Sequence, residues 1–239
     1  MGLTTARDGS PGRRESLCRP ELAIPALPDS NIHSPGDFER AYVGRDWRAY
    51  RWLVAVCVEY GEPGLILDVG AGLGFFVEAC KRYGLPCVGL EGSQYAVEAA
   101  HTRYPIDIHH HYLSQPLPFR DNAVAVVVLN QTLEHLTPPI AGHVLRESFR
   151  VLSSGGLLAI YSPCRYDRTQ TVEPTHINLH TPKSLRAEVL ANGFVRYRAI
   201  DSARTFGKSR LLNMATSLAF RCTGWSMLSA SANCLAYKQ

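Results

Sequence analysis

The stretch GLILDVGAGLGFF, residues 64–76, decides the fold: an apolar run ends at Asp68 and is followed by Gly70, Gly72 and Gly74. Such a run predicts a buried strand, a tight turn and a helix, with bare backbone N–H groups that approach a ligand closely. The dinucleotide-binding pattern G-x-G-x-x-G binds a pyrophosphate, and its acid comes about 20 residues later. Here the third glycine comes one residue early, and a carboxylate precedes the first glycine. Because this carboxylate repels a pyrophosphate, the stretch favours a ligand that carries positive charge.

A second acid ends the next predicted strand. Residues 87–93, CVGLEGS, are typical of a buried strand that ends at Glu91, with Gly92 and Ser93 opening a helix. Glu91 follows Asp68 by 23 residues, which is enough for one strand–helix–strand crossover. An acid at this position accepts two hydrogen bonds from a ribose diol. Because nucleotide cofactors in general share that requirement, Glu91 alone leaves the choice of cofactor open.

Three stretches together resemble one protein family. The spacing of residues 68–74 resembles motif I of the class I S-adenosylmethionine-dependent methyltransferases, whose sulfonium cofactor is cationic. Residues 116–136, PLPFRDNAVAVVVLNQTLEHL, resemble motif III and its flanks. Residues 174–194, PTHINLHTPKSLRAEVLANGF, resemble a stretch that recurs in small-molecule methyltransferases of the ubiquinone and natural-product group. The resemblance runs from Leu67 to Phe194 and implies S-adenosylmethionine as the cofactor.

The resemblance also indicates which residues bind the cofactor. It places them in the glycine loop, at the tip of the second strand and after the third and fourth strands: Asp68, Gly70, Ala71, Gly72, Gly74, Glu91, Gly92, Ser93, Ser114, Asn130 and Gln131. The chain departs from the family pattern at two positions. Ala125 stands where an acid is usual, and Leu113 stands where many relatives carry an acid that binds adenine. We therefore expect the backbone near Ser114 and apolar contacts to hold the adenine.

Apolar strands alternate with amphipathic helices along the chain. The strands are expected at 64–69, 86–91, 106–110, 124–130, 156–162, 194–200 and 232–238, and the helices at 73–83, 94–102, 140–152 and 182–191. Thr137 and Thr181 each precede a proline, as N-caps do, and Gly84 and Gly193 stand where helices end. Right-handed crossovers between such strands predict an α/β fold with a doubly wound, Rossmann-like sheet. The resemblance implies seven mostly parallel strands in the order 3-2-1-4-5-7-6, with helices on both faces.

The chain divides into a leader and one domain. Residues 1–36 carry Gly, Ser, Pro and charges without periodicity, which predicts a flexible leader before a single domain at 37–239. Residues 38–60 are amphipathic and aromatic. The resemblance implies that a helix here closes over the cofactor. The alternative is that the aromatic rings only pack on the sheet. Residues 203–231 lie between the last two strands, where the family builds substrate-side insertions. One interpretation of their basic, amphipathic part, 208–221, is a weak contact with a membrane surface. The alternative is a helix that covers the sheet edge or forms a dimer contact.

Composition indicates an ordinary soluble protein. The 239 residues are 46% hydrophobic and 19% charged, and no run approaches the roughly 18 to 20 apolar residues of a membrane span. The seven cysteines form no C-x-x-C pair, so we expect buried free thiols and a cytoplasmic location. A net charge of +4 without a basic stripe argues against nucleic-acid binding. The oligomeric state stays open.

Two histidines are candidates for the catalytic base. Methyl transfer from a sulfonium is an in-line displacement, and an acceptor hydroxyl must also lose its proton. His135 follows the fourth predicted strand and His176 follows the fifth, so both fall at the carboxyl edge of the sheet. A purely structural role for His135 is the alternative. Residues 130–133, NQTL, lack the [DN]-P-P-[YF] motif of base amino-group methylation.

The same region bears on metal binding. Some relatives bind a divalent ion through E-x-x-E-H, but this chain has Gln131 in place of the first carboxylate, followed by Glu134 and His135. Losing an anionic ligand weakens a site for a hard cation, so the sequence predicts no metal. The run His109–His111 is expected to be a loop rim, because no Cys or acid stands at ligand spacing.

The leading hypothesis is S-adenosylmethionine-dependent methyl transfer to a small-molecule acceptor, at a hydroxyl oxygen of a natural product, sugar or quinone-like compound. One alternative is a non-catalytic cofactor-binding protein of the same fold, which the departures at Leu113, Ala125 and Gln131 allow. The other is a nicotinamide oxidoreductase. Asp68, the glycine spacing and the absence of a Tyr-x-x-x-Lys pair disfavour it.

Overall fold

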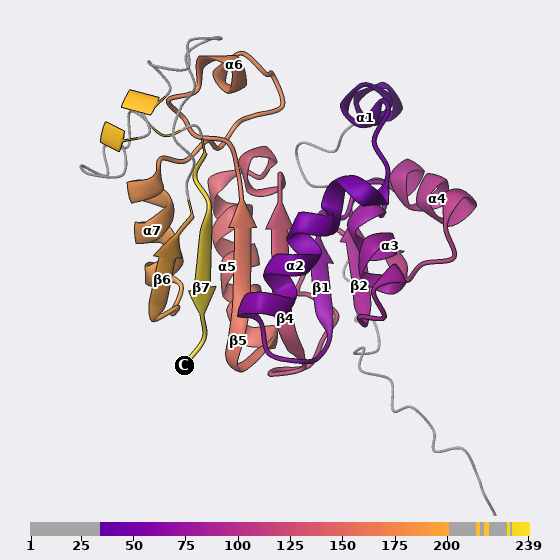
Figure 1. Ribbon diagram of the computed structural model, residues 1–239, viewed down its shortest axis with the longest axis horizontal. Helices are drawn as coiled ribbons and strands as arrows, with labels where there is room; N and C mark the ends of the chain where they lie inside the picture. The colour runs from indigo at the N-terminus through magenta and orange to yellow at the C-terminus, as the bar shows by residue number, and fades with distance from the viewer. Residues whose placement is uncertain (1–33, 201–213, 216–217, 220–228, 230) are drawn as a thin grey trace, which may run out of the picture.

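A seven-stranded sheet forms the centre of the protein in the computed structural model, which describes residues 34–200, 214–215, 218–219, 229 and 231–239 (Figure 1). The strands are β1 Ile66–Val69, β2 Cys87–Glu91, β3 Ile108–His110, β4 Val124–Asn130, β5 Leu152–Tyr161, β6 Arg196–Ala199 and β7 Cys234–Tyr237. Their order is β3-β2-β1-β4-β5-β7-β6. The first five strands are parallel, and β7 is antiparallel to both β5 and β6. The predicted fold class and strand order are therefore confirmed.

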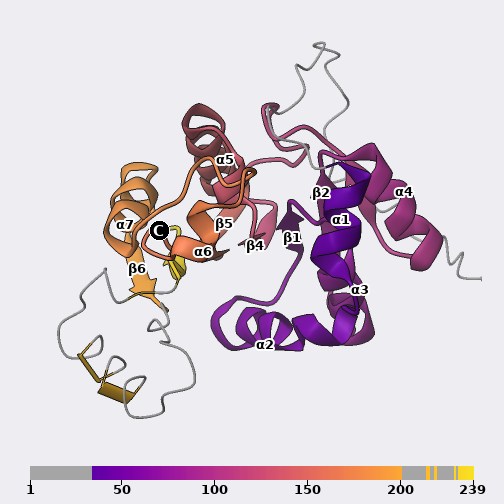
Figure 2. The ribbon, with the colours of Figure 1, turned by 90° about the horizontal axis from the view of Figure 1, so that it is seen from above.

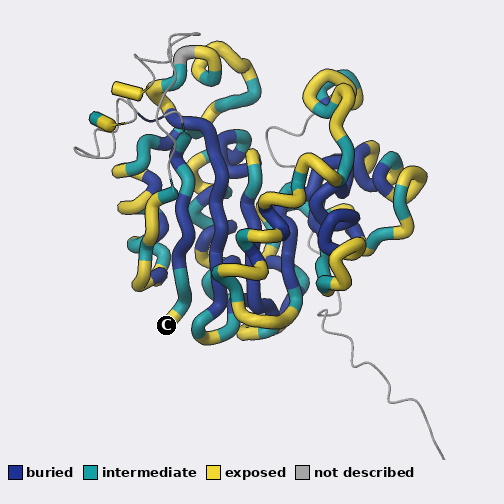
Figure 3. Tube along the Cα trace, viewed as in Figure 1, coloured by how far each residue is buried: buried dark blue, intermediate teal, exposed yellow. Residues whose placement is uncertain are grey.

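Helices cover both faces of the sheet (Figure 2). The longer helices are α2 Arg51–Tyr60, α3 Phe75–Arg82, α4 Gln94–Arg103, α5 Pro138–Val151 and α7 Pro182–Ala191. Ile66 and Val126 pack in one buried cluster with residues of α2 and α3, whereas Leu67 and Val127 pack in another with residues of α5 and α7. This alternation is the period-two pattern of strands buried on both faces. Figure 3 shows the resulting buried strands in dark blue.

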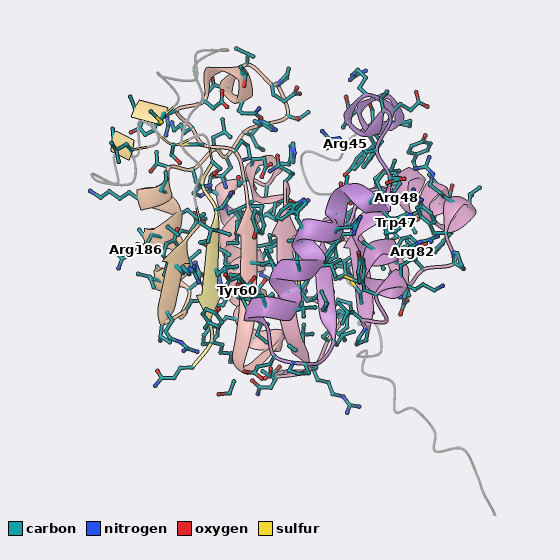
Figure 4. All side chains as sticks on the ribbon, viewed as in Figure 1. Arg45, Trp47, Arg48, Tyr60, Arg82 and Arg186 are labelled. Carbon is teal, nitrogen blue, oxygen red and sulfur yellow. The ribbon has the colours of Figure 1, made fainter. Side chains whose placement is uncertain are left out.

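Four further elements are α1 Pro35–Tyr42, η1 Trp47–Tyr50, η2 Leu133–His135 and α6 Arg168–Thr171. In Figure 1, α1 and α6 lie beyond the edge at which the arrows of β4 and β5 end. In open α/β sheets this carboxyl edge is where ligands bind. Trp47 anchors the N-terminal elements, because the guanidinium groups of Arg48 and Arg82 lie 4.8 and 4.6 Å from its ring centroid (Figure 4).

The expected helix ends are confirmed, with one difference at an N-cap. Gly84 and Gly193 follow helices with left-handed φ angles of 72° and 99°. The Thr181 side chain accepts a hydrogen bond from the Ser184 N–H, and the two residues form a capping box. Thr137 occupies the N-cap position of α5 but makes no side-chain hydrogen bond there.

Strand β5 begins at Leu152, earlier than the expected residue 156. The prediction was wrong because Ser153, Ser154, Gly155 and Gly156 have the composition of a turn. The structure instead continues the chain directly from α5 into the strand, with Gly155 at a φ of 76°. A register shift between Val124 and Val126 on the neighbouring strand accommodates this irregular start.

Two predicted segments lie largely outside the described residues. Of the expected leader, residues 1–33 are not described, and Ser34 already caps α1 through a capping box with Asp37. Of the segment 203–231, only 214–215, 218–219, 229 and 231 are described. Within the described part of the chain, no helix has the length and apolar character needed to cross a membrane.

Candidate functional site

The glycine loop after β1 is held against β2. The N–H groups of Gly70 and Ala71 both donate to the carbonyl of Leu90, at 2.8 and 3.0 Å. Gly70 has a φ of 80°, and a Cβ on it would lie 2.5 Å from the Thr132 side chain. A Cβ on Gly72 would collide with the Tyr42 hydroxyl, at a φ of 54°. These two glycines are therefore required by both backbone conformation and space.

Two desolvated carboxyl groups flank this loop. Asp68 is 3% exposed, and Glu91 is half-buried at the end of β2. The carboxylate of Glu91 accepts hydrogen bonds from the N–H groups of Gly72, at 2.8 Å, and Ser93, at 2.9 Å. Burial, and then the negative charge of Glu91, raise the pKa of Asp68 to about 8. Desolvation also raises the pKa of Glu91, against the opposing effect of its backbone hydrogen bonds.

Neither carboxylate forms an ion pair with Lys or Arg in the part of the chain that the structure describes. Two neighbouring acids that are removed from water are costly to ionise together. A cation placed beside them would stabilise the ionised form of both. The loop is thus suited electrostatically to a positively charged ligand.

Helix α1 brings an aromatic side chain onto the loop. The Tyr42 ring packs against Phe75, with centroids 5.6 Å apart, and its hydroxyl is hydrogen-bonded to Tyr50. Burial raises the pKa of Tyr42 well above its usual range, and the charges of Glu91 and Asp68 add to this effect. Residues 38–60 therefore approach the loop through Tyr42, as a lid would. The same segment also packs on the sheet through α2. It therefore both approaches the loop and packs on the sheet.

A cavity of about 430 Å³ opens at the carboxyl ends of β4 and β5. It is lined by Trp52, Asn130, Gln131, Tyr161, Ser162, Pro163, Asp167, Gln170, Ser231 and Asn233. The rings of Trp52 and Tyr161 meet edge to face, with centroids 4.6 Å apart. Among these lining residues there is one carboxylate and no Lys, Arg or His, so the wall is of mixed polarity and carries little charge.

Glu134, His135 and His176 form a cluster beside this cavity. The loop that carries His176 is fixed to η2, because Ile177 N and Asn178 N both donate to the Glu134 carbonyl at 3.0 Å. The two imidazole rings lie with their centroids 4.9 Å apart. Ser162, which lines the cavity, donates its hydroxyl to Glu134 Oε2 at 3.0 Å. Burial raises the pKa of Glu134 to about 7.

The structure brings the sequence-predicted residues together in two groups. Asp68, Gly70, Ala71, Gly72, Gly74, Glu91, Gly92 and Ser93 lie in or beside the glycine loop. Asn130 and Gln131 line the cavity, and Gln131 leaves β4 with a φ of 56°. Ser93 also caps α4 by accepting from Ala96 N. Ser114 is exposed in the loop after β3, next to the buried Leu113.

Sequence reasoning missed several residues of the site. Thr132 is buried, donates its hydroxyl to the Val69 carbonyl at 3.0 Å and fills the space that a Cβ on Gly70 would need. Trp52 and Ser162 line the cavity from α2 and from the end of β5. No motif marks a threonine or serine for such contacts. Tyr42 was within the aromatic segment that suggested a lid, and only its position on the loop was not foreseen.

Comparisons with known proteins agree with this geometry. Residues 67–160 match a family model described as a methyltransferase domain. A protein named "Probable S-adenosylmethionine-dependent methyltransferase" from Mycobacterium tuberculosis is 27% identical over 164 residues. The chain is thus similar to S-adenosylmethionine-dependent methyltransferases in its sequence. The alignment with this relative covers 66% of the present chain and 57% of the relative, so the chain spans little more than half of its length.

Solved methyltransferase structures share the fold. A S-adenosylmethionine-dependent methyltransferase from Archaeoglobus fulgidus superimposes with a TM-score of 0.64 at 16% identity, covering 86% of this chain and 100% of that one. Geranyl diphosphate C-methyltransferase from Streptomyces coelicolor, solved with Mg²⁺, geranyl diphosphate and S-adenosylhomocysteine, gives 0.60 at 16%, covering 88% and 89%. At these identities the likeness shows a shared fold.

Proposed function

We propose that the protein transfers a methyl group from S-adenosylmethionine to a hydroxyl oxygen of a small, uncharged acceptor. The observation that carries this proposal is the pair Asp68 and Glu91, two desolvated carboxyl groups beside the glycine loop without a Lys or Arg ion pair among the described residues. S-adenosylmethionine carries a sulfonium and an ammonium charge and also a ribose diol. It therefore offers the positive charge that these acids lack, and its diol can add hydrogen bonds to those that Glu91 accepts from Gly72 and Ser93.

The character of the cavity supports an uncharged, hydroxylated acceptor. Its amide side chains, such as Asn130 and Gln170, offer both donors and acceptors, which suits hydroxyl groups. Trp52 and Tyr161 offer ring surfaces for an apolar ring face. With no Lys, Arg or His in its lining, the cavity has no charge complement for a phosphate or carboxylate acceptor. Sugars, hydroxylated natural products and reduced quinone-like compounds share this chemistry.

His135 and His176 supply the proton acceptors in this proposal. Nδ1 of His135 donates to the Thr175 carbonyl and Nδ1 of His176 donates to the Gln170 carbonyl, both at 3.0 Å. The lone pair of each ring is then on Nε2, where it can accept a proton from an acceptor hydroxyl. Gln170 and Ser162 join this cluster to the cavity, since both line the cavity and both hydrogen-bond to the cluster. Positioning of the acceptor for in-line attack supplies the rest of the catalysis.

The free cysteines support a reducing compartment, which we take to be the cytoplasm. Cys57, Cys80, Cys87, Cys164 and Cys234 form no disulfide among the described residues. Burial raises the pKa of Cys57 and Cys87, so these thiols are poorly nucleophilic. Thiols of this kind are typical of proteins that fold without disulfides.

Calorimetry of the full chain with S-adenosylmethionine tests the proposed function. We expect micromolar binding that Asp68→Ala and Glu91→Ala each weaken at least tenfold, roughly 1.4 kcal/mol. Absence of binding to the intact chain contradicts the proposal outright. A panel of hydroxylated acceptors with methyl-labelled cofactor then tests turnover. Tight binding without methyl transfer to any of them favours the non-catalytic alternative, and binding of NADH in place of S-adenosylmethionine favours the oxidoreductase.

A further inference from the structure

Three side chains that can each coordinate a metal ion lie together at the carboxyl edge of the sheet. One ligand atom from each of Glu134, His135 and His176 lies within 4.8 Å of the other two. Glu134 is fully buried, whereas the two imidazoles are half-buried and thus accessible from one side. The cluster joins η2 to a loop whose histidine comes 41 residues later in the chain.

The hydrogen bonds of the two histidines fix which ring nitrogen carries the lone pair. Backbone carbonyls accept only from an N–H, so Nδ1 of His135 and Nδ1 of His176 are both protonated. In the neutral rings, Nε2 therefore carries the lone pair. A backbone carbonyl on the other ring nitrogen is the partner that orients metal-ligating histidines in proteins.

The buried carboxylate has one oxygen that the protein leaves unpaired. Oε2 of Glu134 accepts from the Ser162 hydroxyl, but Oε1 is buried and has no hydrogen-bond partner among the described residues. An unpaired buried carboxylate oxygen is costly. It lies in the same cluster as the two histidines, so a cation there would satisfy it.

We propose that Glu134, His135 and His176 bind one divalent transition-metal ion of the Zn²⁺, Fe²⁺ or Co²⁺ class. Two imidazoles and one carboxylate form a borderline donor set, which these ions accept. Mg²⁺ and Ca²⁺ prefer oxygen ligands throughout and are disfavoured. Around a tetrahedral Zn²⁺ the ligand atoms lie about 3.3 Å apart. The present separations are at most 4.8 Å, so metal binding requires the side chains to move toward one another.

Gln131 is not part of this site. Its side-chain amide donates to the Tyr161 carbonyl at 3.3 Å, and its φ of 56° directs the chain away from a regular strand end. The expectation of no metal came from the neutral amide at position 131. The site proposed instead takes its third ligand from His176, in a different loop, and so does not need a carboxylate at that position.

Three protein ligands leave at least one coordination position for another oxygen. An acceptor hydroxyl that reached this position from the cavity would lose its proton more readily, as metal-bound water does. This role in the reaction rests on the methyl transfer proposed above. Binding of the ion itself does not, because the ligands belong to the protein alone.

Metal titration of the chelator-treated full chain, without S-adenosylmethionine, tests the site. We expect one equivalent of Co²⁺ to bind with a d–d absorption typical of nitrogen and oxygen ligands, and Zn²⁺ to displace it. His135→Ala and His176→Ala are each expected to lower the affinity at least 100-fold, and Glu134→Gln at least tenfold. His109→Ala is the matched control, since this exposed histidine lies on β3 and outside the cluster. The His109→Ala variant is expected to bind Co²⁺ with wild-type affinity. A large excess of Mg²⁺ should not displace Co²⁺ from the site.

The proposal is overturned if neither Co²⁺ nor Zn²⁺ binds stoichiometrically, if His135→Ala and His176→Ala retain wild-type affinity, or if His109→Ala loses it. Mg²⁺ competing as well as Zn²⁺ would overturn the assigned class of ion. Circular dichroism checks that each variant is folded, and His176→Gln replaces His176→Ala if the latter is not. Cofactor binding is measured on the same samples. Metal binding without cofactor binding contradicts only the proposed function, and cofactor binding without metal binding contradicts only the metal site.

Discussion

Asp68 in β1 and Glu91 at the end of β2 are carried by neighbouring parallel strands, and the negative charge of Glu91 helps to raise the pKa of Asp68 to about 8. The glycine loop passes between these acids and is itself bonded to Glu91 through the N–H of Gly72. In the absence of a ligand, Asp68 is therefore protonated over much of the neutral pH range. Both the binding and the stability of the protein should depend on this proton.

Cofactor affinity is expected to rise with pH. A cationic ligand stabilises the ionised form of Asp68, so binding releases a proton below the pKa of about 8. The dissociation constant should fall about tenfold per pH unit between pH 6 and pH 8 and level off above. Calorimetry in buffers of different ionisation enthalpy counts the released proton. The amino group of the ligand also titrates in this range, so Asp68→Asn provides the baseline, and an equal pH dependence in both proteins would refute the assignment.

Stability without ligand is expected to show the opposite trend. The pKa of Asp68 is about 8 when folded and about 3.9 when unfolded, so its contribution to stability is complete below about pH 4 and is lost as the pH rises through 8. Asp68→Asn removes this loss. Urea unfolding gives the free energy of unfolding of Asp68→Asn and of the wild type. The difference, variant minus wild type, should be at least about 2 kcal/mol greater at pH 8.5 than at pH 5. A constant difference across this range would mean that Asp68 is ionised in the folded protein.

Gly70 and Gly155 separate backbone strain from steric collision. Both have similar left-handed φ angles, 80° and 76°, but a Cβ on Gly70 would lie 2.5 Å from Thr132, whereas nothing lies within 4 Å of a Cβ on Gly155. Gly155→Ala should therefore cost about 1 kcal/mol, from backbone strain alone. Gly70→Ala should cost about 2 to 4 kcal/mol and weaken cofactor binding at least tenfold. Adding Thr132→Ala should restore part of the loss, and failure of this rescue would show that Thr132 is not the obstacle.

The fold was readable because its signals are local and repeated. The apolar runs of β1 and β4, the glycines after β1 and the Thr–Pro start of α7 each fix a strand, turn or helix end by short-range chemistry. The start of β5 was not predicted, because Ser–Ser–Gly–Gly favours a turn, whereas the structure places these residues in an irregular part of the strand between the pairs Val124–Leu152 and Val126–Leu157.

The site was only partly readable for a related reason. Asp68 and Glu91 follow strand ends and are marked by the glycine pattern. Other contacts of the site join residues that are far apart in the chain: Thr132 with Val69, Ser162 with Glu134, and His135 with His176. No spacing rule connects their positions, so these contacts become visible only when β4, β5 and the following loops are packed together.

His176→Ala is expected to reduce turnover at least 100-fold while the dissociation constant of S-adenosylmethionine stays within twofold of the wild type. His176 lies in the cluster beside the cavity, and among the described residues it makes no hydrogen bond, ion pair or ring contact with the glycine loop, Asp68 or Glu91. Loss of a proton acceptor, or of a ligand to an ion that activates the hydroxyl, slows only the chemical step. Rapid-quench measurement of methyl transfer and calorimetry of the cofactor separate the two effects. Equal losses in both would place His176 in the support of the cofactor site.

Trp52 is expected to contribute to acceptor binding rather than cofactor binding. It is 46% exposed, its ring meets Tyr161 edge to face, and both rings line the cavity at the ends of β4 and β5. Trp52→Ala should raise the acceptor KM about tenfold, because a ring stacked on a substrate contributes roughly 1 to 2 kcal/mol, with little change in cofactor affinity. Val58→Ala is the matched control, since Val58 lies on the same helix, is 62% exposed and does not line the cavity. If both variants raise KM equally, the effect comes from α2 as a whole and Trp52 has no specific role in holding the acceptor.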